Sequence, residues 1–174
     1  MARYKAPVFN ADTLLVDARE KWTQDGNKDD HIRKWLEWAK IPYTVQALNV
    51  GDYMLPGGTI SVDRKQNLDE VSKNLTNPAD SSRFMREVRR AHASGIRLVV
   101  LVEHGRNIQT MDDVRNWTSN YTGVHGYYLA RQMHRLELAY KVRWVFCEKR
   151  AAARKIIEIL TEQENKHDKQ EEKQ

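Results

Sequence analysis

Three charged residues stand close together where residues 50–70 read VGDYMLPGGTISVDRKQNLDE. Asp52 precedes a Pro-Gly-Gly turn, and Asp63 and Lys65 follow the turn with one residue between them. Because alternate side chains of a β-strand point to opposite faces, Asp63 and Lys65 share one face of the strand after the turn. A hairpin would bring Asp52 onto the neighbouring strand. The spacing therefore predicts two carboxylates and one ammonium group at a single site.

These three groups suit the hydrolysis of a phosphodiester. Two carboxylates on paired strands can share one Mg²⁺ ion, which takes oxygen ligands and is commonly held by one or two carboxylates together with a substrate phosphate. Such a cation lowers the pKa of a bound water and neutralises charge on the phosphate. Lys65 would orient the water or stabilise the charge that develops on the phosphate.

Two further carboxylates, Asp17 and Glu20, follow a short apolar run. Residues 14–16 predict a buried strand, and Asp17 ends it, where a charge is costly without a partner. Candidate partners are a metal ion and the side chains of Arg19, Arg64 and Lys65. Glu20 lies in the loop that follows and would reach the same edge of the sheet.

Strand and helix patterns alternate along the chain. Apolar runs predict five strands, at residues 12–20, 43–55, 59–65, 96–105 and 142–147. Apolar residues at helical spacing predict helices at residues 32–39, 67–75, 77–95, 127–141 and 149–163, with a short helix inside 110–126. This order predicts an α/β fold with a central mixed β-sheet of about five strands flanked by helices.

The composition is that of a globular chain with a basic excess. The 174 residues are 40% hydrophobic and 30% charged, with a net charge of +5, so one domain with a real core is expected. Positive charge suits an anionic partner such as nucleic acid, although charge alone does not identify one. The single cysteine, Cys147, excludes an internal disulfide and a cysteine-based zinc site.

The domain is expected to span residues 1–164. Residues 165–174 are charged and lack apolar side chains, which predicts a disordered tail. No apolar stretch approaches the ~20 residues of a membrane span, and the first ten residues lack the apolar core of a signal peptide. We therefore expect no membrane partner and an intracellular location, cytoplasmic, or nuclear in a eukaryotic source.

The motifs, taken together, resemble those of the XPF-type structure-specific endonucleases. GDY at 51–53 followed by DRKQNLD at 63–69 is similar to the family's GDx…ERKxxxD signature. Similar segments also occur in VDARE at 16–20, SSRFMREVRRA at 81–91 and LVVLVE at 98–103. The likeness covers roughly residues 12–150 in the family's order, and it is specific as a set, whereas Asp-x-Lys alone would be weak.

The resemblance implies a restriction-endonuclease-like nuclease fold of the PD-(D/E)xK type. It also implies Mg²⁺- or Mn²⁺-dependent cleavage of branched or flapped DNA in recombination, repair or replication. The metal ligands it implies are Asp17, Asp52 and Asp63. The catalytic residues it implies are Glu20, Asp52, Asp63, Arg64 and the catalytic lysine Lys65, and the DNA contacts are Arg64, Asp69 and Arg83.

Two departures from the family pattern affect these expectations. Asp63 stands where the family usually has Glu, so the carboxylate reach is one methylene shorter and metal preference is expected to differ. Nothing after residue 164 resembles the helix-hairpin-helix domain with which many relatives dimerise. A homodimer is still expected, because the segment 124–160 is apolar enough to pair with itself.

Other interpretations stay open. The chain could be a non-catalytic DNA-structure-binding module or partner subunit, or a site-specific restriction-like enzyme. Asp63 and Lys65 alone could form an exposed cross-strand pair that contributes little. Asp69 could simply favour a helix N-terminus. Glu103 could join the metal site or end a strand in solvent, and Trp22 could stack on a base.

Overall fold

The computed structural model describes residue 9 and the ranges 11–20 and 31–162. Within these residues six strands form one sheet in the order β2-β1-β3-β4-β5-β6. The strands are β1 Leu14–Asp17, β2 Tyr43–Gln46, β3 Tyr53–Met54, β4 Ile60–Lys65, β5 Arg97–Glu103 and β6 Arg143–Cys147. The helices are α1 His31–Trp38, α2 Leu68–Thr76, α3 Pro78–Ala93, α4 Met111–Arg115, α5 Gly126–Tyr140 and α6 Ala152–Thr161, the last preceded by the 3-10 turn η2 Lys149–Ala151. Trp22 and the tail 165–174 lie outside the described residues.

The sheet is mixed, as the sequence predicts. β4, β5 and β6 run parallel to one another, and β1 and β2 are also parallel. The short strand β3 joins the two groups, because it pairs antiparallel with both β1 and β4. The hairpin of β3 and β4 therefore stands in the middle of the sheet.

The prediction of one strand over residues 43–55 is wrong, which is why six strands form where about five were expected. This segment gives β2 and β3, which lie on opposite sides of β1. The strand β2 ends at Gln46, and the chain bends over residues 49–52, where Gly51 has a φ of +66°. Asp52 directly precedes β3, where its amide donates to the carbonyl of Val62 and its own carbonyl accepts from Asp17 N–H, both at 2.8 Å.

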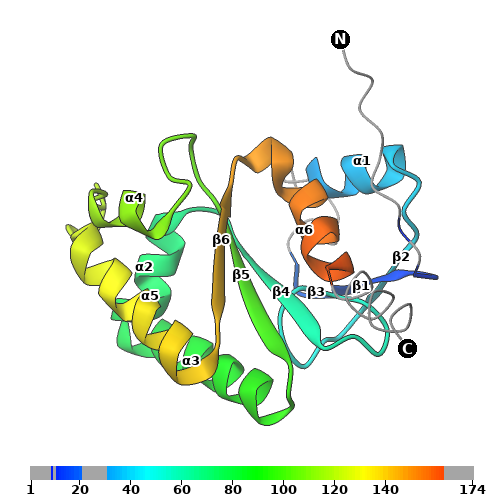
Figure 1. The fold of residues 1–174 in the computed structure, drawn as a ribbon, viewed down its shortest axis with the longest axis horizontal. Helices are drawn as coiled ribbons and strands as arrows, with labels where there is room; N and C mark the ends of the chain where they lie inside the picture. Colours follow the sequence, from blue (N-terminus) through cyan, green and yellow to red (C-terminus); the bar gives the residue numbers. More distant parts are fainter. Residues whose placement is uncertain (1–8, 10, 21–30, 163–174) are drawn as a thin grey trace, which may run out of the picture.

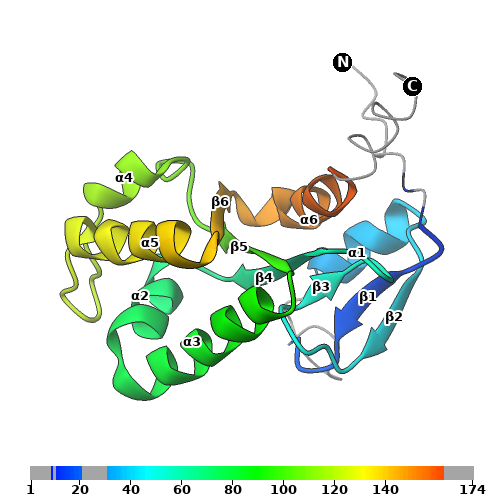
Figure 2. The same cartoon turned by 60° about the horizontal axis from the view of Figure 1, so that its bottom comes forward.

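Helices cover both faces of the sheet. α1 and α6 pack on one face and α2, α3, α4 and α5 on the other (Figure 1; Figure 2). Alternate residues of β5 supply the two cores: Val99 and Leu101 face α1 and α6, whereas Leu98, Val100 and Val102 face the other helices. The continuous apolar run of this strand follows from its burial on both faces.

Local signals place the two helices beside the predicted site. α2 begins after Asn67, whose side chain accepts from the Glu70 amide. α3 begins with Pro78 after its N-cap Asn77 and ends just before Gly95, whose φ is +69°. Among the described helices none is long and apolar enough to cross a bilayer.

Candidate active site

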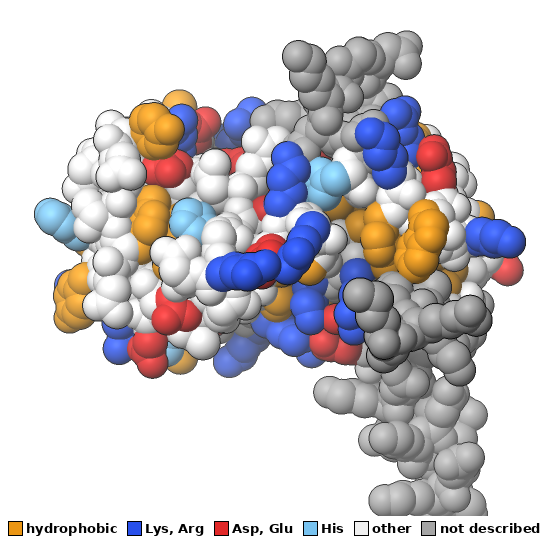
Figure 3. Space-filling view, turned by 90° about the horizontal axis from the view of Figure 1, so that it is seen from above, with side chains coloured by type: hydrophobic (Ala, Val, Ile, Leu, Met, Phe, Trp, Pro, Cys, Tyr) orange, Lys and Arg blue, Asp and Glu red, His pale blue; other side chains and the backbone are white. Residues whose placement is uncertain are grey.

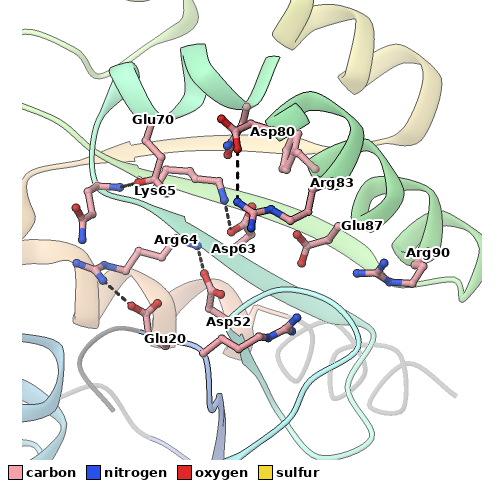
Figure 4. A pocket seen from close by; sticks show the side chains of 14 residues that line it. Glu20, Asp52, Asp63, Arg64, Lys65, Glu70, Asp80, Arg83, Glu87 and Arg90 are labelled. Atoms are coloured by element: carbon pink, nitrogen blue, oxygen red, sulfur yellow. Dashed lines mark hydrogen bonds and ion pairs between the residues drawn. The ribbon is translucent and has the colours of Figure 1, made fainter. Parts of the chain in front are cut away.

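One cavity of about 280 Å³ between β4 and α3 brings together six of the residues predicted to carry chemistry, namely Glu20, Asp52, Asp63, Arg64, Lys65 and Arg83 (Figure 4). Glu20 lies on one side of it, and Arg83, Glu87 and Arg90 of α3 lie on the other. The residues between these sides are Asp52, Asp63 and Lys65. The hairpin and α3 build the site together, although they are separate segments of the chain.

Asp63 and Lys65 share one face of β4, as their spacing predicts. Lys65 Nζ lies 2.7 Å from Asp63 Oδ1, and its ammonium stands 5.4 Å from the centre of the Phe84 ring. The Asp63 side chain is buried, and among the described residues its second oxygen, Oδ2, has no hydrogen-bond partner. An unpaired buried carboxylate oxygen is costly unless a ligand occupies it.

Asp52 supplies the second carboxylate. Its Oδ2 accepts from the backbone amide of Arg64 at 2.7 Å, which fixes it against β4. Burial, followed by the negative charges of Asp63 and Glu20, holds the pKa of Asp52 well above its usual value. A divalent cation between the two carboxylates would relieve this repulsion.

Lys65 stays protonated in this setting. Burial acts to lower its pKa, but the charges of Asp63 and Asp52 outweigh burial and raise the pKa above its usual value. These charges favour the protonated form of Lys65, which is a cation and a hydrogen-bond donor.

Glu87 of α3 belongs to the site, and the sequence analysis missed it. Its carboxylate accepts from the Gly51 amide at 2.7 Å, and burial and then the charge of Asp63 raise its pKa. The only sequence signal is a carboxylate four residues after Arg83 and three before Arg90, which places all three on one helix face.

Arg64 does not take the predicted role. It points away from Asp63 and Lys65, donates to Glu103 at 2.6 and 3.1 Å and to Glu20 at 2.9 Å, and its side chain is only 2% exposed. This burial disagrees with the prediction of Arg64 as a DNA contact. Arg64 lines the cavity, and it holds Glu20 there.

Glu103 belongs to the same buried network, and His31 Nε2 lies 3.0 Å from its Oε1. Of the two interpretations left open for Glu103, neither holds, because its carboxylate serves Arg64 and His31 inside the protein.

The structure separates Asp17 from the carboxylates around the cavity. Both of its oxygens are bonded, to the Arg19 guanidinium at 2.7 and 2.8 Å and to the Leu48 amide at 2.7 Å. Burial acts to raise the pKa of Asp17, but the bonds from Arg19 and Leu48 lower it overall. Asp17 does not line the cavity, whereas Arg19 does. This placement disagrees with the prediction of Asp17 as a metal ligand.

The two predicted DNA contacts outside β4 are placed differently. Arg83 is 77% exposed at the cavity and forms an ion pair with Asp80 at 3.6 Å, so its predicted phosphate contact stays open. Asp69 does not line the cavity. Its Oδ1 accepts from Ser119 Oγ at 2.5 Å, and Ser119 in turn accepts from the amide of Tyr121. Asp69 thus anchors the segment before α5.

Positive side chains also gather beyond the cavity. The turns after β5 and β6 lie at the top of Figure 1 and face the viewer in Figure 3, where Lys and Arg side chains gather near the middle of the face. Arg106 and Arg150 in these turns are 75% and 73% exposed, and both bond to Glu148. Gln66 lines both the depression beside Arg106 and the cavity, so the two surfaces are continuous.

Asp52 and Asp63 fit a hard divalent cation. The unpaired Asp63 oxygen and the raised pKa of Asp52 both favour a cation beside them. Among the described residues no three His, Cys, Asp or Glu side chains are grouped closely enough to hold a metal by themselves. The fit is therefore to Mg²⁺ or Mn²⁺, which keep water and phosphate ligands beside one or two carboxylates.

A mixed sheet covered by helices on both faces, with Asp52 and the Asp63-x-Lys65 pair at its centre, defines the class of restriction-endonuclease-like nuclease folds. The family model described as the ERCC4 domain matches residues 16–160. The chain therefore belongs to the ERCC4 domain family, which confirms the XPF-type resemblance.

Solved structures agree with this fold. One of XPF from Aeropyrum pernix has a TM-score of 0.60 at 21% identity, covering 85% of this chain and 59% of that one. A second, of XPF from Aeropyrum pernix in complex with DNA, has a TM-score of 0.60 at 22% identity, covering 88% and 65%. This chain thus spans less than two thirds of either. A comparison with curated protein sequences finds no match.

Proposed function

We propose that this chain is a metal-dependent DNA endonuclease that hydrolyses phosphodiester bonds in branched or flapped DNA during recombination, repair or replication. The observation that carries the proposal is the Asp63 carboxylate, which is bonded to Lys65 through one oxygen and unpaired at the other, beside Asp52. Family membership supports a nuclease, and the DNA complex of the Aeropyrum pernix XPF supports DNA as the partner.

The residues divide the work of hydrolysis by charge and position. Asp52 and Asp63 would hold Mg²⁺ or Mn²⁺, which when bound supplies a Lewis acid and an activated water. Lys65, kept protonated by its two carboxylate neighbours, donates to the reacting phosphate or orients the attacking water. Glu20 is held at the cavity by Arg64, and its carboxylate would take part in the reaction there.

Cleavage of labelled forks, flaps, four-way junctions and plain duplex tests this proposal. Asp63→Asn keeps the shape of the side chain but removes its charge. We expect its cleavage rate to fall by more than the roughly 10–100-fold loss seen when a residue that contacts a metal ligand, and not the metal itself, is replaced. Asp112→Asn is the matched control, because Asp112 is 81% exposed on α4 and lies away from the cavity. Equal cleavage by wild type and Asp63→Asn would place the active site elsewhere.

A non-catalytic DNA-structure-binding module is the second candidate. The observation that favours it is that Asp17, one of the three predicted metal ligands, is bonded to Arg19 and the Leu48 amide and does not line the cavity. The same assay separates the two functions. A wild-type protein that binds forked DNA but cuts none of the four substrates with Mg²⁺ or Mn²⁺ would leave the module as the function.

A homodimer is proposed as the assembly. Within residues 124–160 the exposed large apolar side chains are Tyr127, Tyr128 and Leu138, at 70%, 49% and 65%. All three belong to α5, so its outer surface offers a self-association face. Light scattering at micromolar concentration should give a dimer mass for wild type and a monomer mass for Leu138→Arg, and a monomeric wild type would contradict the proposal.

A further inference from the structure

We propose that Arg19 is a phosphate-binding residue at the cavity and that buried Asp17 is its positioning residue. This inference rests on the proposed nuclease function and names the groups that hold the DNA strand on the side of the cavity away from α3. It replaces the expectation that Asp17 binds the metal.

The geometry around Asp17 fixes one edge of the Arg19 guanidinium. Arg19 Nε and Nη2 donate to Asp17 Oδ1 and Oδ2 at 2.7 and 2.8 Å, and Nη2 also donates to the Leu48 carbonyl at 2.8 Å. The Arg19 backbone amide donates to Asp17 Oδ1 as well, at 2.7 Å. A two-bond ion pair of this kind sets both the distance and the plane of the guanidinium.

The opposite edge of the same guanidinium remains available. Arg carries five N–H donors, and those of Nη1 meet no acceptor among the described residues. The Arg19 side chain is 71% exposed, although its partner Asp17 is 0% exposed. A buried carboxylate thus holds an exposed cation with two donors pointing away from it.

Arg19 lines the cavity together with Asp52 and Glu87. The bond to Asp17 is the main cause that raises the pKa of Arg19, and the charges of Glu87 and Asp52 add to it, so Arg19 lies within electrostatic reach of the carboxylates in the cavity. Its cation is therefore permanent and close to the predicted position of the reacting phosphate.

Arg19 adds a cation on this side of the cavity. The cavity carboxylates repel a phosphate backbone, and Lys65 and Arg64 are already bonded to carboxylates. The other arginines that line the cavity, Arg83 and Arg90, lie on α3. Arg90 is additionally bonded to the Asn49 carbonyl at 3.1 Å. Arg19 lies on the β1 side of the cavity and Arg83 on the α3 side. Successive phosphates of one DNA strand would then be held on either side of the proposed metal ligands.

The salt dependence of DNA binding tests this inference. Affinity for a forked DNA is measured against KCl concentration without divalent cation, since Mg²⁺ itself competes for phosphates. Each phosphate contact contributes about 0.7–0.9 to the slope of log affinity against log salt. We expect Arg19→Ala to reduce the slope by about one contact. Arg115→Ala is the charge-matched control, because Arg115 is 58% exposed on α4 and lies outside the cavity, and it should leave the slope unchanged.

Asp17→Asn separates positioning from metal binding. This variant keeps an acceptor for the Leu48 amide but loses the ion pair with Arg19. We therefore expect the slope of log affinity against log salt to fall as it does in Arg19→Ala, although Asp17 itself is buried and cannot contact DNA. Mn²⁺ affinity measured by calorimetry without DNA should stay at the wild-type value, whereas a metal ligand would lose it. If Asp17→Asn does not fold, the slope of Arg19→Ala decides by itself.

Each outcome has a distinct meaning. A wild-type slope for Arg19→Ala in a protein that still binds and cuts DNA would overturn this inference and leave the proposed function intact. Loss of Mn²⁺ affinity in Asp17→Asn would restore Asp17 as a metal ligand and overturn its positioning role. A wild-type protein that neither binds nor cuts DNA would overturn the proposed function and this inference with it.

Discussion

Arg64 and Glu103 form a buried ion pair, in which Nε lies 2.6 Å from Oε1 and Nη2 lies 3.1 Å from Oε2. Both side chains are 2% exposed. Burial acts to raise the pKa of Glu103, but bonds from His31 and Arg64 hold it below its usual value. The pair ties β4 to β5, and through Glu20 it extends to the cavity. We therefore treat Arg64 as part of the framework of the site.

Removing one partner of this pair should destabilise the fold strongly. Arg64→Ala leaves the carboxylates of Glu103 and Glu20 buried without their cation, and we expect a loss of about 3–5 kcal/mol in the free energy of unfolding. Urea unfolding measures it, with Arg33→Ala on the surface of α1 as the control. An Arg64→Ala protein of wild-type stability with a reduced salt slope for DNA binding would instead favour the phosphate contact.

The alternation of β4 could be predicted from sequence, and the alternation alone puts Arg64 on the face opposite to Asp63 and Lys65. The family resemblance nevertheless assigned Arg64 to DNA, because a motif names residues without saying which face of the strand each occupies. The meeting of Asp52 and Asp63 at one site could be predicted from their spacing around the hairpin turn. Glu87 could not, since its contact with Gly51 spans 36 residues and depends on how α3 packs.

Asp17 and the segment 43–55 show a second limit of prediction from the sequence. Asp17 at a strand end needed a partner. The sequence offered a metal ion, Arg19, Arg64 and Lys65, and the family resemblance favoured the metal. Only the folded geometry shows that Arg19 and the Leu48 amide satisfy it. The same contact holds the chain between β2 and β3, where an apolar run alone predicted a continuous strand.

Gly51 is required by both backbone and space. Its φ is +66°, and a Cβ there would lie 2.2 Å from Ser61 Oγ and 2.9 Å from the Val62 carbonyl oxygen. Gly51→Ala should therefore lose about 2 kcal/mol or more of stability and displace Asp52. Gly57→Ala is the matched control, because Gly57 has φ +70° but open space, so only about 1 kcal/mol of backbone strain is expected. Equal losses in thermal unfolding would contradict this difference.

The Glu87 carboxylate accepts a hydrogen bond from the Gly51 amide and also adds a negative charge to the cavity. Two substitutions separate these two effects. Glu87→Gln keeps an acceptor for Gly51 N–H, so stability should hold while Mn²⁺ affinity falls severalfold, since one nearby charge contributes on the order of 1 kcal/mol. Glu87→Ala also leaves that buried amide unpaired, and we expect a further loss of about 1–3 kcal/mol in unfolding free energy. Unchanged Mn²⁺ affinity in both variants, measured by calorimetry, would limit Glu87 to structure.

Asp52 makes the effect of metal on stability depend on pH. Its pKa in the fold lies well above its usual 3.8, so the folded protein keeps a proton that the unfolded chain has released. The resulting contribution to stability is full below the usual pKa and is lost as pH rises through the raised one. The pKa of Glu87, raised by burial and Asp63, acts in the same direction. Asp17 and Glu103, whose pKa values are lowered, contribute stability that is lost only as pH falls.

A divalent cation binds the deprotonated carboxylates, so the stabilisation by Mg²⁺ should grow as pH rises from about 5 to about 8. Thermal unfolding across that range, with Mg²⁺ and with chelator, measures the difference. Asp52→Asn removes the titrating group, and we expect it to reduce the growth with pH and to make the metal-free protein more stable at neutral pH. A Mg²⁺ effect that is constant over the whole range would show that Asp52 does not exchange its proton for the metal.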